Sequence, residues 1–336
     1  MYKYIILIIL YFPIFSWLYY LNKVAWILEF ILGMIMYLTV FYLFHIVWKH
    51  YRKKEALDLI EYGKKFYLSV GTLIYVTVWI IWLFWYYHLE YKPLNISQVT
   101  ISNWEKNVVF QKMIHIAKPH YYESIQQEIK NYKQDGYVYF FEWVQWWSEE
   151  NMEKFNKALW IEFDTNLYSN LSKLYDLVPQ KNWDFLNIEN NEDYNIDMNI
   201  DEIIQEYEQA KKQANITNQY STPVDVNWEI INQLTQLNPR QLVILQFVNL
   251  SFLSALTKNE EVLSAIQNNF WNEILFNIIL EWRNKVVAEE IINSQENNIF
   301  ATYWALHFDW ILQLLQENDS NWKIISEKPF FPFSEQ

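Results

Sequence analysis

Three long apolar segments near the start of the chain constrain its fold more than any other feature. Tyr4 to Leu21 and Val24 to Trp48 are almost uninterrupted apolar runs, and Phe66 to His88 contains no Asp, Glu, Lys or Arg. Each is close to the roughly 20 residues that a helix needs to cross a bilayer. We therefore predict a membrane anchor with three transmembrane helices over residues 1–91, followed by a folded domain over residues 92–336.

Basic residues between the second and third segments predict how the anchor is oriented. Lys49, Arg52–Lys54 and Lys64–Lys65 lie in the loop that joins them. Short loops rich in Lys and Arg stay on the cytoplasmic side. We therefore expect a multi-pass protein of the cytoplasmic membrane, with residues 92–336 outside the cytoplasm. The first segment could instead be a signal peptide, but no small-residue cleavage site follows it, and the domain's location is the same either way.

Charge and cysteine content exclude some classes of function. Residues 1–91 hold eight Lys/Arg and five Asp/Glu, so the net charge of −13 for the chain corresponds to −16 for the remainder. Nucleic-acid binding needs clustered Lys and Arg, so no nucleic-acid partner is expected. The chain contains no cysteine, which excludes disulfides and thiolate metal sites.

The folded domain begins with a strand–helix–strand pattern. Val108–Ile116 is apolar and rich in strand-forming residues, and His115 lies near its end. Residues 120–134 carry apolar side chains at helical spacing, directly after Pro119, which suits a first helical turn. A second apolar strand, Tyr137–Phe141, follows a turn. This order predicts two strands joined by a helical crossover.

Residues with useful chemistry follow the predicted strands. Glu142 comes directly after the second strand, and a third strand predicted over Asn298–His307 ends on a histidine, before a helix over Phe308–Gln316. If the first two strands are parallel, His115 and Glu142 lie near the same edge of the sheet. Sites in open α/β sheets form at that edge. His307 occupies the equivalent place in the C-terminal unit.

Between these two units the sequence is mainly helical. Ser148–Val178 has one apolar face at helical spacing, and further helical segments lie between residues 203 and 292. The acidic stretch 190–202 predicts a solvated linker, because its Asp and Asn spacing fits no calcium-binding loop. Trp322–Ser326 predicts a last strand. The expected fold class is α/β (α+β): a central mixed β-sheet built from two strand–helix units with a helical middle insertion, preceded by three transmembrane helices.

Glycine and tryptophan have unusual frequencies in the domain. Residues 92–336 contain twelve tryptophans and one glycine, Gly136, where average usage gives roughly 17 glycines. Several tryptophans stand where an Asn-Gly turn is expected, in Asn103-Trp104, Asn182-Trp183, Asn227-Trp228 and Asn321-Trp322. We hypothesise that many of the tryptophans are glycines, from the gene of a bacterium that reads UGA as glycine, translated here with a code that reads UGA as tryptophan. The alternative is a chain that is truly rich in tryptophan.

The hairpin predicted over Thr100–Val109 illustrates this hypothesis. It would form well if position 104 adopted a positive φ, a conformation that tryptophan takes badly.

Two parts of the domain resemble a known family. Glu281–Ile324 places an Arg-Asn pair, Arg283-Asn284, at a helix start and His307 at a strand end, and Phe110–Tyr122 places His115 at another strand end. With the Glu142 segment YFFEWV, they resemble the TraB/GumN/Tiki superfamily, which is related to the ChaN and erythromycin-esterase group. The likeness extends over about Asn103–Pro332.

The departures from the family pattern fit the glycine hypothesis. Trp104, Trp143, Trp304, Trp310 and Trp322 stand where the family has, or often has, glycine. Lys112 also replaces a family glycine, and the hypothesis does not explain it.

The resemblance implies a compact α/β domain with a cleft lined by both histidines and the glutamate. Tiki proteins are membrane-anchored, divalent-metal-dependent peptidases that act outside the cell, and TraB-like proteins are linked to shutting down peptide pheromones. The implied partners are therefore a membrane and a peptide or protein. The implied cofactor is a divalent metal ion such as Mn, Co or Zn, held by His115, Glu142 and His307.

The chemistry of these side chains is compatible with that role. Two imidazoles and a carboxylate suit a first-row divalent ion and leave positions open for water. Glu142 could ligate the ion or act as a general base. Arg283 could hold a substrate carboxylate or a developing oxyanion, and Asn284 could orient it. Structural roles are the alternative for each residue, and Arg283 could simply pair with Glu281 or Glu289.

Two functions therefore remain open. The first is a membrane-anchored, metal-dependent peptidase or hydrolase that acts outside the cytoplasmic membrane, with Glu142, Arg283 and Asn284 as catalytic residues. The second is a non-catalytic module on the same fold that binds or sequesters a peptide, as a pheromone inhibitor would. Convergence of His115, Glu142 and His307 on one pocket favours the first.

Overall fold

A computed structural model divides the chain into two compact units. One comprises Met1–Tyr87 and Leu237–Ile244, and the other His88–Gln236 and Leu245–Gln336. The structure describes residues 2–52, 57–144, 148–159, 162, 166–186, 193–213, 223–258 and 273–334. Most side chains before Glu29 lie outside this description.

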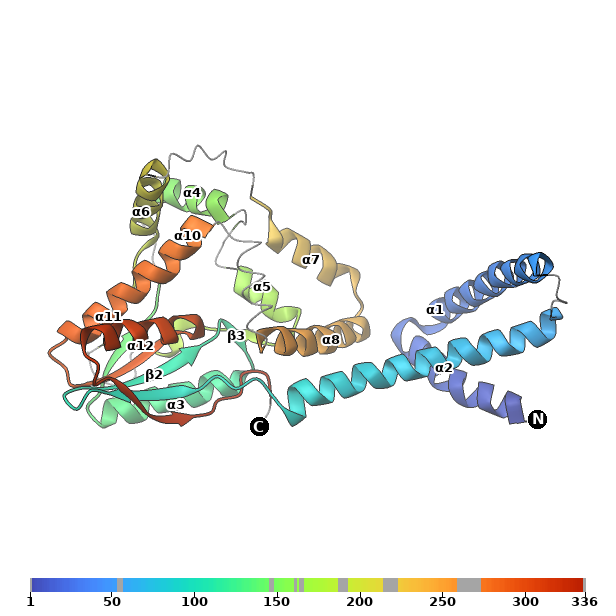
Figure 1. Cartoon of the computed structure of the whole chain (residues 1–336), viewed down its shortest axis with the longest axis horizontal. Coiled ribbons are helices and arrows are strands. Elements are labelled where there is room, and N and C mark those ends of the chain that lie inside the picture. Colours follow the sequence, from blue (N-terminus) through green and yellow to red (C-terminus); the bar gives the residue numbers. More distant parts are fainter. Residues whose placement is uncertain are drawn as a thin grey trace. The chain divides into compact units, whose positions relative to one another are not determined.

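The first unit contains two long helices, α1 (Tyr2–Tyr51) and α2 (Leu59–Trp85), the second of which continues into a π-helical stretch, η1 (Tyr86–Tyr91) (Figure 1). The two segments predicted as separate spans, Tyr4–Leu21 and Val24–Trp48, lie within the single helix α1. The predicted third span lies in α2 and η1. Many apolar side chains of both helices are exposed, as expected for helices that face lipid.

Three helices in the described part of the chain are long and apolar enough to cross a membrane. They cover Glu29–Tyr51, Leu59–Tyr91 and Pro239–Thr257. The first two agree with predicted spans, and the predicted span Tyr4–Leu21 falls where most side chains are not described. The third is α8 (Pro239–Thr257), which the sequence assigns to the domain 92–336. By length and composition, the chain has the helices of a membrane-associated protein.

The second unit is organised around a mixed six-stranded sheet with the order β6–β4–β7–β2–β1–β8. β6, β4, β7 and β2 are parallel to one another, whereas β1 pairs antiparallel with both β2 and β8. The bounds are β1 Gln98–Ser102, β2 Asn107–Met113, β4 Val138–Phe141, β6 Asp193–Asn195, β7 Asn298–Trp304 and β8 Lys323–Lys328. The mixed sheet expected from the sequence is present, and β7 from the C-terminal unit lies between the two strands of the N-terminal unit.

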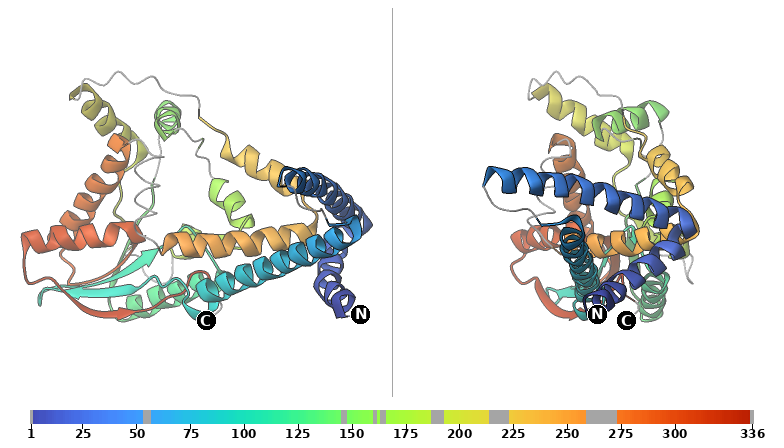
Figure 2. Two further views of the ribbon diagram at one scale, coloured as in Figure 1. Left: turned by 45° about the vertical axis from the view of Figure 1, so that its right-hand side comes forward. Right: turned by 90° about the vertical axis from the view of Figure 1, so that its right-hand side faces the viewer.

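Helices cover both faces of this sheet, α3 on one side and α11 and α12 on the other (Figures 1 and 2). Their bounds are α3 Pro119–Gln134, α11 Arg283–Asn293 and α12 Phe308–Asn318. Strand side chains alternate between the two cores. Val108, Phe110 and Ala301 pack with α11 and α12, and Val109 and Phe300 pack with α3. This period-2 alternation is what a sheet buried on both faces requires.

The middle of the chain supplies a third, smaller core. α4 (Glu149–Leu159) and α6 (Ile200–Gln213) pack with α10 (Glu273–Asn277) and the π-helical η3 (Ile278–Trp282) around Phe155, Ile204 and Tyr207, among others. The other described elements are α5 Leu167–Lys173, α7 Val226–Gln236, the short strands β3 Ile116–Ala117 and β5 Val178–Pro179, and the 3-10 turns η2 Asn182–Asp184 and η4 Ala305–His307.

Three differences from the sequence-based assignment affect the site. The helix predicted over Ser148–Val178 is divided into α4 and α5 before the strand β5. The predicted linker 190–202 contains β6 and the start of α6. The strand predicted to end at His307 ends at Trp304, whose amide donates to the Glu142 carboxylate at 2.6 Å, and the 3-10 turn Ala305–His307 follows.

Candidate functional site

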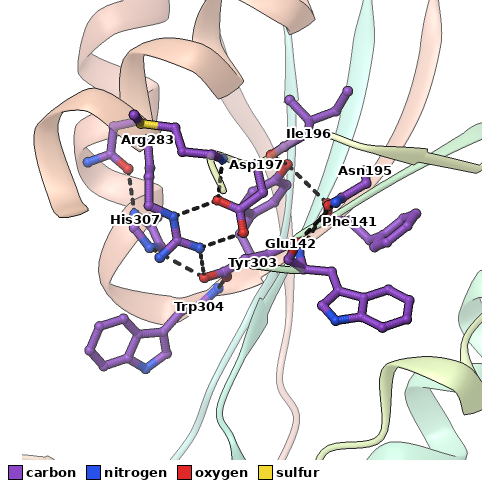
Figure 3. Close-up of polar contacts among 12 residues, drawn as sticks. Phe141, Glu142, Asn195, Ile196, Asp197, Arg283, Tyr303, Trp304 and His307 are labelled. Atoms are coloured by element: carbon purple, nitrogen blue, oxygen red, sulfur yellow. Dashed lines mark hydrogen bonds and ion pairs between the residues drawn. The ribbon is translucent and has the colours of Figure 1, made fainter. Parts of the chain in front are cut away.

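Four parallel strands end at one edge of the sheet, and a polar residue follows each of them. Asp197 comes two residues after β6, Glu142 directly after β4, and His115 two residues after β2. His307 lies in the turn η4 that follows β7. Parallel strands bring their carboxyl ends together, so residues from four distant parts of the sequence meet at this edge. Figure 3 shows Asp197, Glu142 and His307 of this cluster together with Arg283.

Arg283 links two carboxylates at the centre of this cluster (Figure 3). Its Nε donates to Asp197 Oδ1 at 2.7 Å and its Nη2 to Asp197 Oδ2 at 2.9 Å, which is a bidentate pair. Nη2 also forms an ion pair with Glu142 Oε1. All three side chains are almost inaccessible to solvent. The sequence suggested Glu281 or Glu289 as an alternative partner, but the arginine reaches across to β4 and β6 instead.

A π-helical turn helps to explain why Arg283 and its neighbour Asn284 are both buried. η3 ends at Trp282, and α11 starts at Arg283. A π turn changes the angular position of the residues that follow it, and such turns are common at functional sites. Arg283 then points toward the carboxylates and Asn284 toward His307.

His307 is held in one orientation by Asn284. Its Nδ1 donates to Asn284 Oδ1 at 2.6 Å, and the histidine and the asparagine are 1% and 0% exposed. The other ring nitrogen, Nε2, has no hydrogen-bond partner. Its nearest charged neighbour is Glu142 Oε1, at 3.8 Å. A proton on Nδ1 leaves a lone pair on Nε2, directed into the cluster.

Glu142 is the residue that joins the two halves of the cluster. Its Oε1 faces Arg283 and His307, and its Oε2 accepts a hydrogen bond from the Trp304 amide. Burial alone would raise the pKa of Glu142, but the positive charge of Arg283, together with His307, His115 and the Trp304 amide, lowers it to about 2. The carboxylate is therefore ionised at neutral pH.

The other titratable groups shift for identifiable reasons. Burial lowers the pKa of His307 to about 4, so its imidazole is neutral at pH 7. Burial also lowers the pKa of His115. Burial raises the pKa of Asp197 to about 6 against the opposing charge of Arg283, while the negative charge of Glu142 raises it further. The cluster therefore combines neutral imidazoles with one guanidinium shared by two carboxyl groups.

The indole of Trp304 contacts both His115 and His307 and so connects His115 to the cluster. The centroids of the His115 and Trp304 rings are 5.7 Å apart, and those of Trp304 and His307 are 6.1 Å apart. Tyr168, from α5, lies against the other side of this group, with its ring 4.6 Å from that of His115. Both predicted histidines therefore contact one aromatic side chain.

The loops that carry the site are fastened to the sheet. Asn195 binds the backbone of Trp143 at two points. Its Oδ1 accepts from the Trp143 amide at 3.1 Å, and its Nδ2 donates to the Trp143 carbonyl at 2.9 Å. The Tyr303 hydroxyl donates to the Ile196 carbonyl. These bonds fix the chain directly after Glu142 and directly before Asp197, and so position both carboxylates.

The structure brings four of the predicted site residues together, places His115 beside them across the Trp304 indole, and adds Asp197. Glu142, Arg283, Asn284 and His307 are in direct contact or within 3.8 Å of one another through the pairs described above. Asp197 was missed because the polar run 190–202 predicts a linker. A usable signal was present: Tyr194, Ile196 and Met198 alternate with polar residues, as in a short strand entering the core.

In the part of the chain that the structure describes, no three or more His, Cys, Asp or Glu side chains are grouped closely enough to hold a metal ion. The indole of Trp304 contacts both histidines, and Arg283 occupies one side of Glu142.

Comparison of the chain with protein-family models, curated proteins and solved structures finds no match.

Proposed function

We propose that the chain is a membrane-anchored hydrolase of the TraB/GumN/Tiki type that cleaves a peptide outside the cytoplasmic membrane with the help of a divalent metal ion. The observation that carries this proposal is the buried, unpartnered Nε2 of His307, which faces an ionised glutamate. Buried polar atoms in native proteins almost always have a partner, and an ion or a water molecule that binds there is one explanation for an exception.

The environment of His307 supports a role as a metal ligand. Ligating histidines usually donate their second ring N–H to an oxygen, which fixes the tautomer, and Asn284 Oδ1 accepts such a bond. A low pKa keeps the imidazole neutral, as ligation requires. His307 and Glu142 would hold the ion, with His115 as the third ligand. The ion would activate water and polarise a peptide carbonyl.

The contacts suggest separate roles for the remaining residues. A general base works best with a pKa near the operating pH, so Glu142, with a pKa of about 2, suits ligation better than proton abstraction. Arg283 is occupied by two carboxylates and is a positioning residue that keeps Glu142 charged. Asn284 positions His307.

One observation favours the second candidate, a peptide-binding module without catalysis. The described residues contain no ready-made group of three metal-binding side chains. The Trp304 indole lies against both histidines and would keep such a group from forming, whether the protein is a hydrolase or a binding module.

Peptide hydrolysis by the full chain in detergent or nanodiscs, with glycine at position 304, tests the proposal. We expect cleavage of unstructured peptides in the presence of Mn²⁺, Co²⁺ or Zn²⁺, loss of cleavage with a chelator, and loss in His307→Ala. His50→Ala is the matched control, because His50 is exposed near the end of α1. Hydrolysis that survives in His307→Ala would contradict the proposal. Peptide binding without any cleavage would favour the second candidate.

A further inference from the structure

Position 104 has a backbone conformation that does not suit its side chain. Trp104 lies in the turn between β1 and β2 with φ of 78°. This left-handed region is open to glycine and is rarely adopted by bulky residues. The turn imposes it: Asn103 Oδ1 accepts from the amides of Glu105 and Lys106 at 3.3 and 2.9 Å.

Packing offers no compensation for this conformation. The Trp104 side chain is 83% exposed, so its indole buries little surface. The described chain has two other residues with positive φ, Gly136 at 82° and Asp176 at 54°. Aspartate tolerates this region and glycine is the usual choice there. Position 104 therefore has a φ angle close to that of Gly136, the single glycine of residues 92–336, but carries a tryptophan side chain.

Position 304 has a side chain that does not suit the site. Its backbone amide holds Glu142 Oε2 at 2.6 Å, and any residue except proline can supply this bond. Its indole packs against the imidazoles of both His115 and His307. The large apolar indole thus takes up the space next to the two imidazoles. The hydrogen bond to Glu142 comes from the backbone amide alone and does not need the indole.

We propose that residues 104 and 304 are glycine in the working protein, because their codons are UGA and its host reads UGA as glycine. The inference for position 104 is independent of function, whereas that for position 304 rests on the function proposed above. With glycine at 304, the Trp304 amide bond to Glu142 remains, and the volume of the indole becomes ligand space beside His115, Glu142 and His307. A divalent cation or a substrate carbonyl then has direct access to Nε2 of His307.

Trp322 differs from residues 104 and 304, because its side chain is well packed. Trp322 is 2% exposed and packs in the core formed by the sheet with α11 and α12. Glycine there would leave a large cavity, which is destabilising in a close-packed core. The sequence hypothesis includes Trp322, but its packing supports tryptophan, so the proposal is confined to positions 104 and 304.

The nucleotide sequence and the mass of the protein from its own host test the proposal directly. We expect UGA at codons 104 and 304, and peptides from the native protein with the mass of glycine at both positions. UGG at either codon would overturn the proposal, as would a native peptide that carries tryptophan at either position. Neither measurement depends on activity, so this test can succeed even if the proposed function fails.

Binding of Mn²⁺ to the full chain then separates the two proposals. We expect Trp304→Gly to bind Mn²⁺ at least tenfold more tightly than the chain with tryptophan, and Trp304→Phe, which keeps an aromatic ring in the site, to show no gain. Glycine codons without any Mn²⁺ binding by Trp304→Gly would leave the codon inference standing and reject the metal site. Equal affinity of Trp304→Gly and Trp304→Phe would overturn the claim that the indole blocks the site.

Discussion

Arg283 determines the charge of the site. It is paired with both Asp197 and Glu142, so one positive charge faces two carboxyl groups in a region almost free of water. With both carboxylates ionised and both histidines neutral, the cluster carries an excess of one negative charge. This net negative charge attracts positively charged ligands such as a divalent cation.

Acid should destabilise the fold through His307. Its pKa falls from 6.5 to about 4 on folding, so the folded state resists protonation. A depressed pKa contributes stability that is present above pH 6.5 and is lost as the pH falls through 4. The full effect is about 3 kcal/mol. The raised pKa of Asp197 acts in the opposite direction over the same pH range, so the effect of His307 is measured as a difference. Between pH 7 and pH 4, unfolding in detergent should show a larger loss of stability for the unmodified chain than for His307→Gln.

Protonation of Glu142 also lowers the free energy of unfolding in acid, but at lower pH, because the pKa of Glu142 is depressed to about 2. His50→Gln should leave the pH dependence between 7 and 4 unchanged, since that side chain is exposed. An unchanged pH profile in His307→Gln would show that His307 is not buried in the neutral form.

The tautomer of His307 can be measured on its own. Asn284 Oδ1 accepts from Nδ1, so we expect the ¹⁵N imidazole shifts of His307 to show a protonated Nδ1 and a bare Nε2. Asn284→Leu removes the acceptor and should abolish this preference. Because the buried amide is replaced by an apolar side chain of similar size, the fold should be retained. A protonated Nε2 in the unmodified chain would contradict the proposed orientation.

At the scale of elements, the hairpin β1–β2 is tied to the helix that carries Arg283 and Asn284. Lys106 Nζ donates to the carbonyls of Ile291, Ile292 and Ser294 at 2.8, 2.9 and 2.6 Å. These lie at the C-terminal end of α11, where carbonyls lack helical partners and the helix dipole favours a cation. Burial lowers the pKa of Lys106. This single side chain therefore caps the site-bearing helix.

We expect Lys106→Met to destabilise the full chain by about 1–3 kcal/mol, because three carbonyls lose a charged donor. Chemical unfolding in detergent measures this. Lys130→Met on α3 is a suitable control and should change stability by less than about 0.5 kcal/mol. A similar small effect in Lys106→Met would mean that solvent satisfies the α11 carbonyls and that the lysine is dispensable.

Local pattern was sufficient to locate most of the elements around the site. The alternation and turn signals of residues 98–141 and 298–328 predicted the strands and helices observed there, including the hairpin whose turn needs a positive φ. The strand order was not predictable, because β7 pairs with β2 and β4 through contacts between residues that lie far apart in the sequence, such as Asn298 with Asn107 and Ile299 with Val138. Asp197 was missed because the polar run 190–202 predicts a linker, and its partner Arg283 lies too far away in the sequence to correct that prediction.

At the scale of the whole molecule, the sheet restricts how the chain can cross a membrane. α8 is apolar and long enough for a span. However, β7 follows α8 in the sequence and pairs with β2 and β4, which precede it. A single crossing by α8 would place paired strands on opposite sides of the bilayer. A single crossing by α8 is therefore incompatible with the sheet, and we expect any crossings to lie in the N-terminal helices.

The basic loop after α1 predicts where the domain is located. If Lys49–Lys54 and Lys64–Lys65 stay in the cytoplasm, residues 92–336 lie outside it. A phosphatase reporter at the C-terminus should be active and a fluorescent reporter there dark, with the opposite result for fusions near residue 55. An active fluorescent reporter at the C-terminus would reverse the topology and exclude extracytoplasmic peptides as substrates.

Calorimetric titration of the full chain, with glycine at position 304, tests the central claim most directly. That claim is that His115, Glu142 and His307 form one metal-binding site at the carboxyl edge of the sheet. We predict one Mn²⁺, Co²⁺ or Zn²⁺ bound per chain, with affinity lost in His307→Ala and kept in His50→Ala. Equal affinity in the His307→Ala and unmodified proteins would contradict the claim.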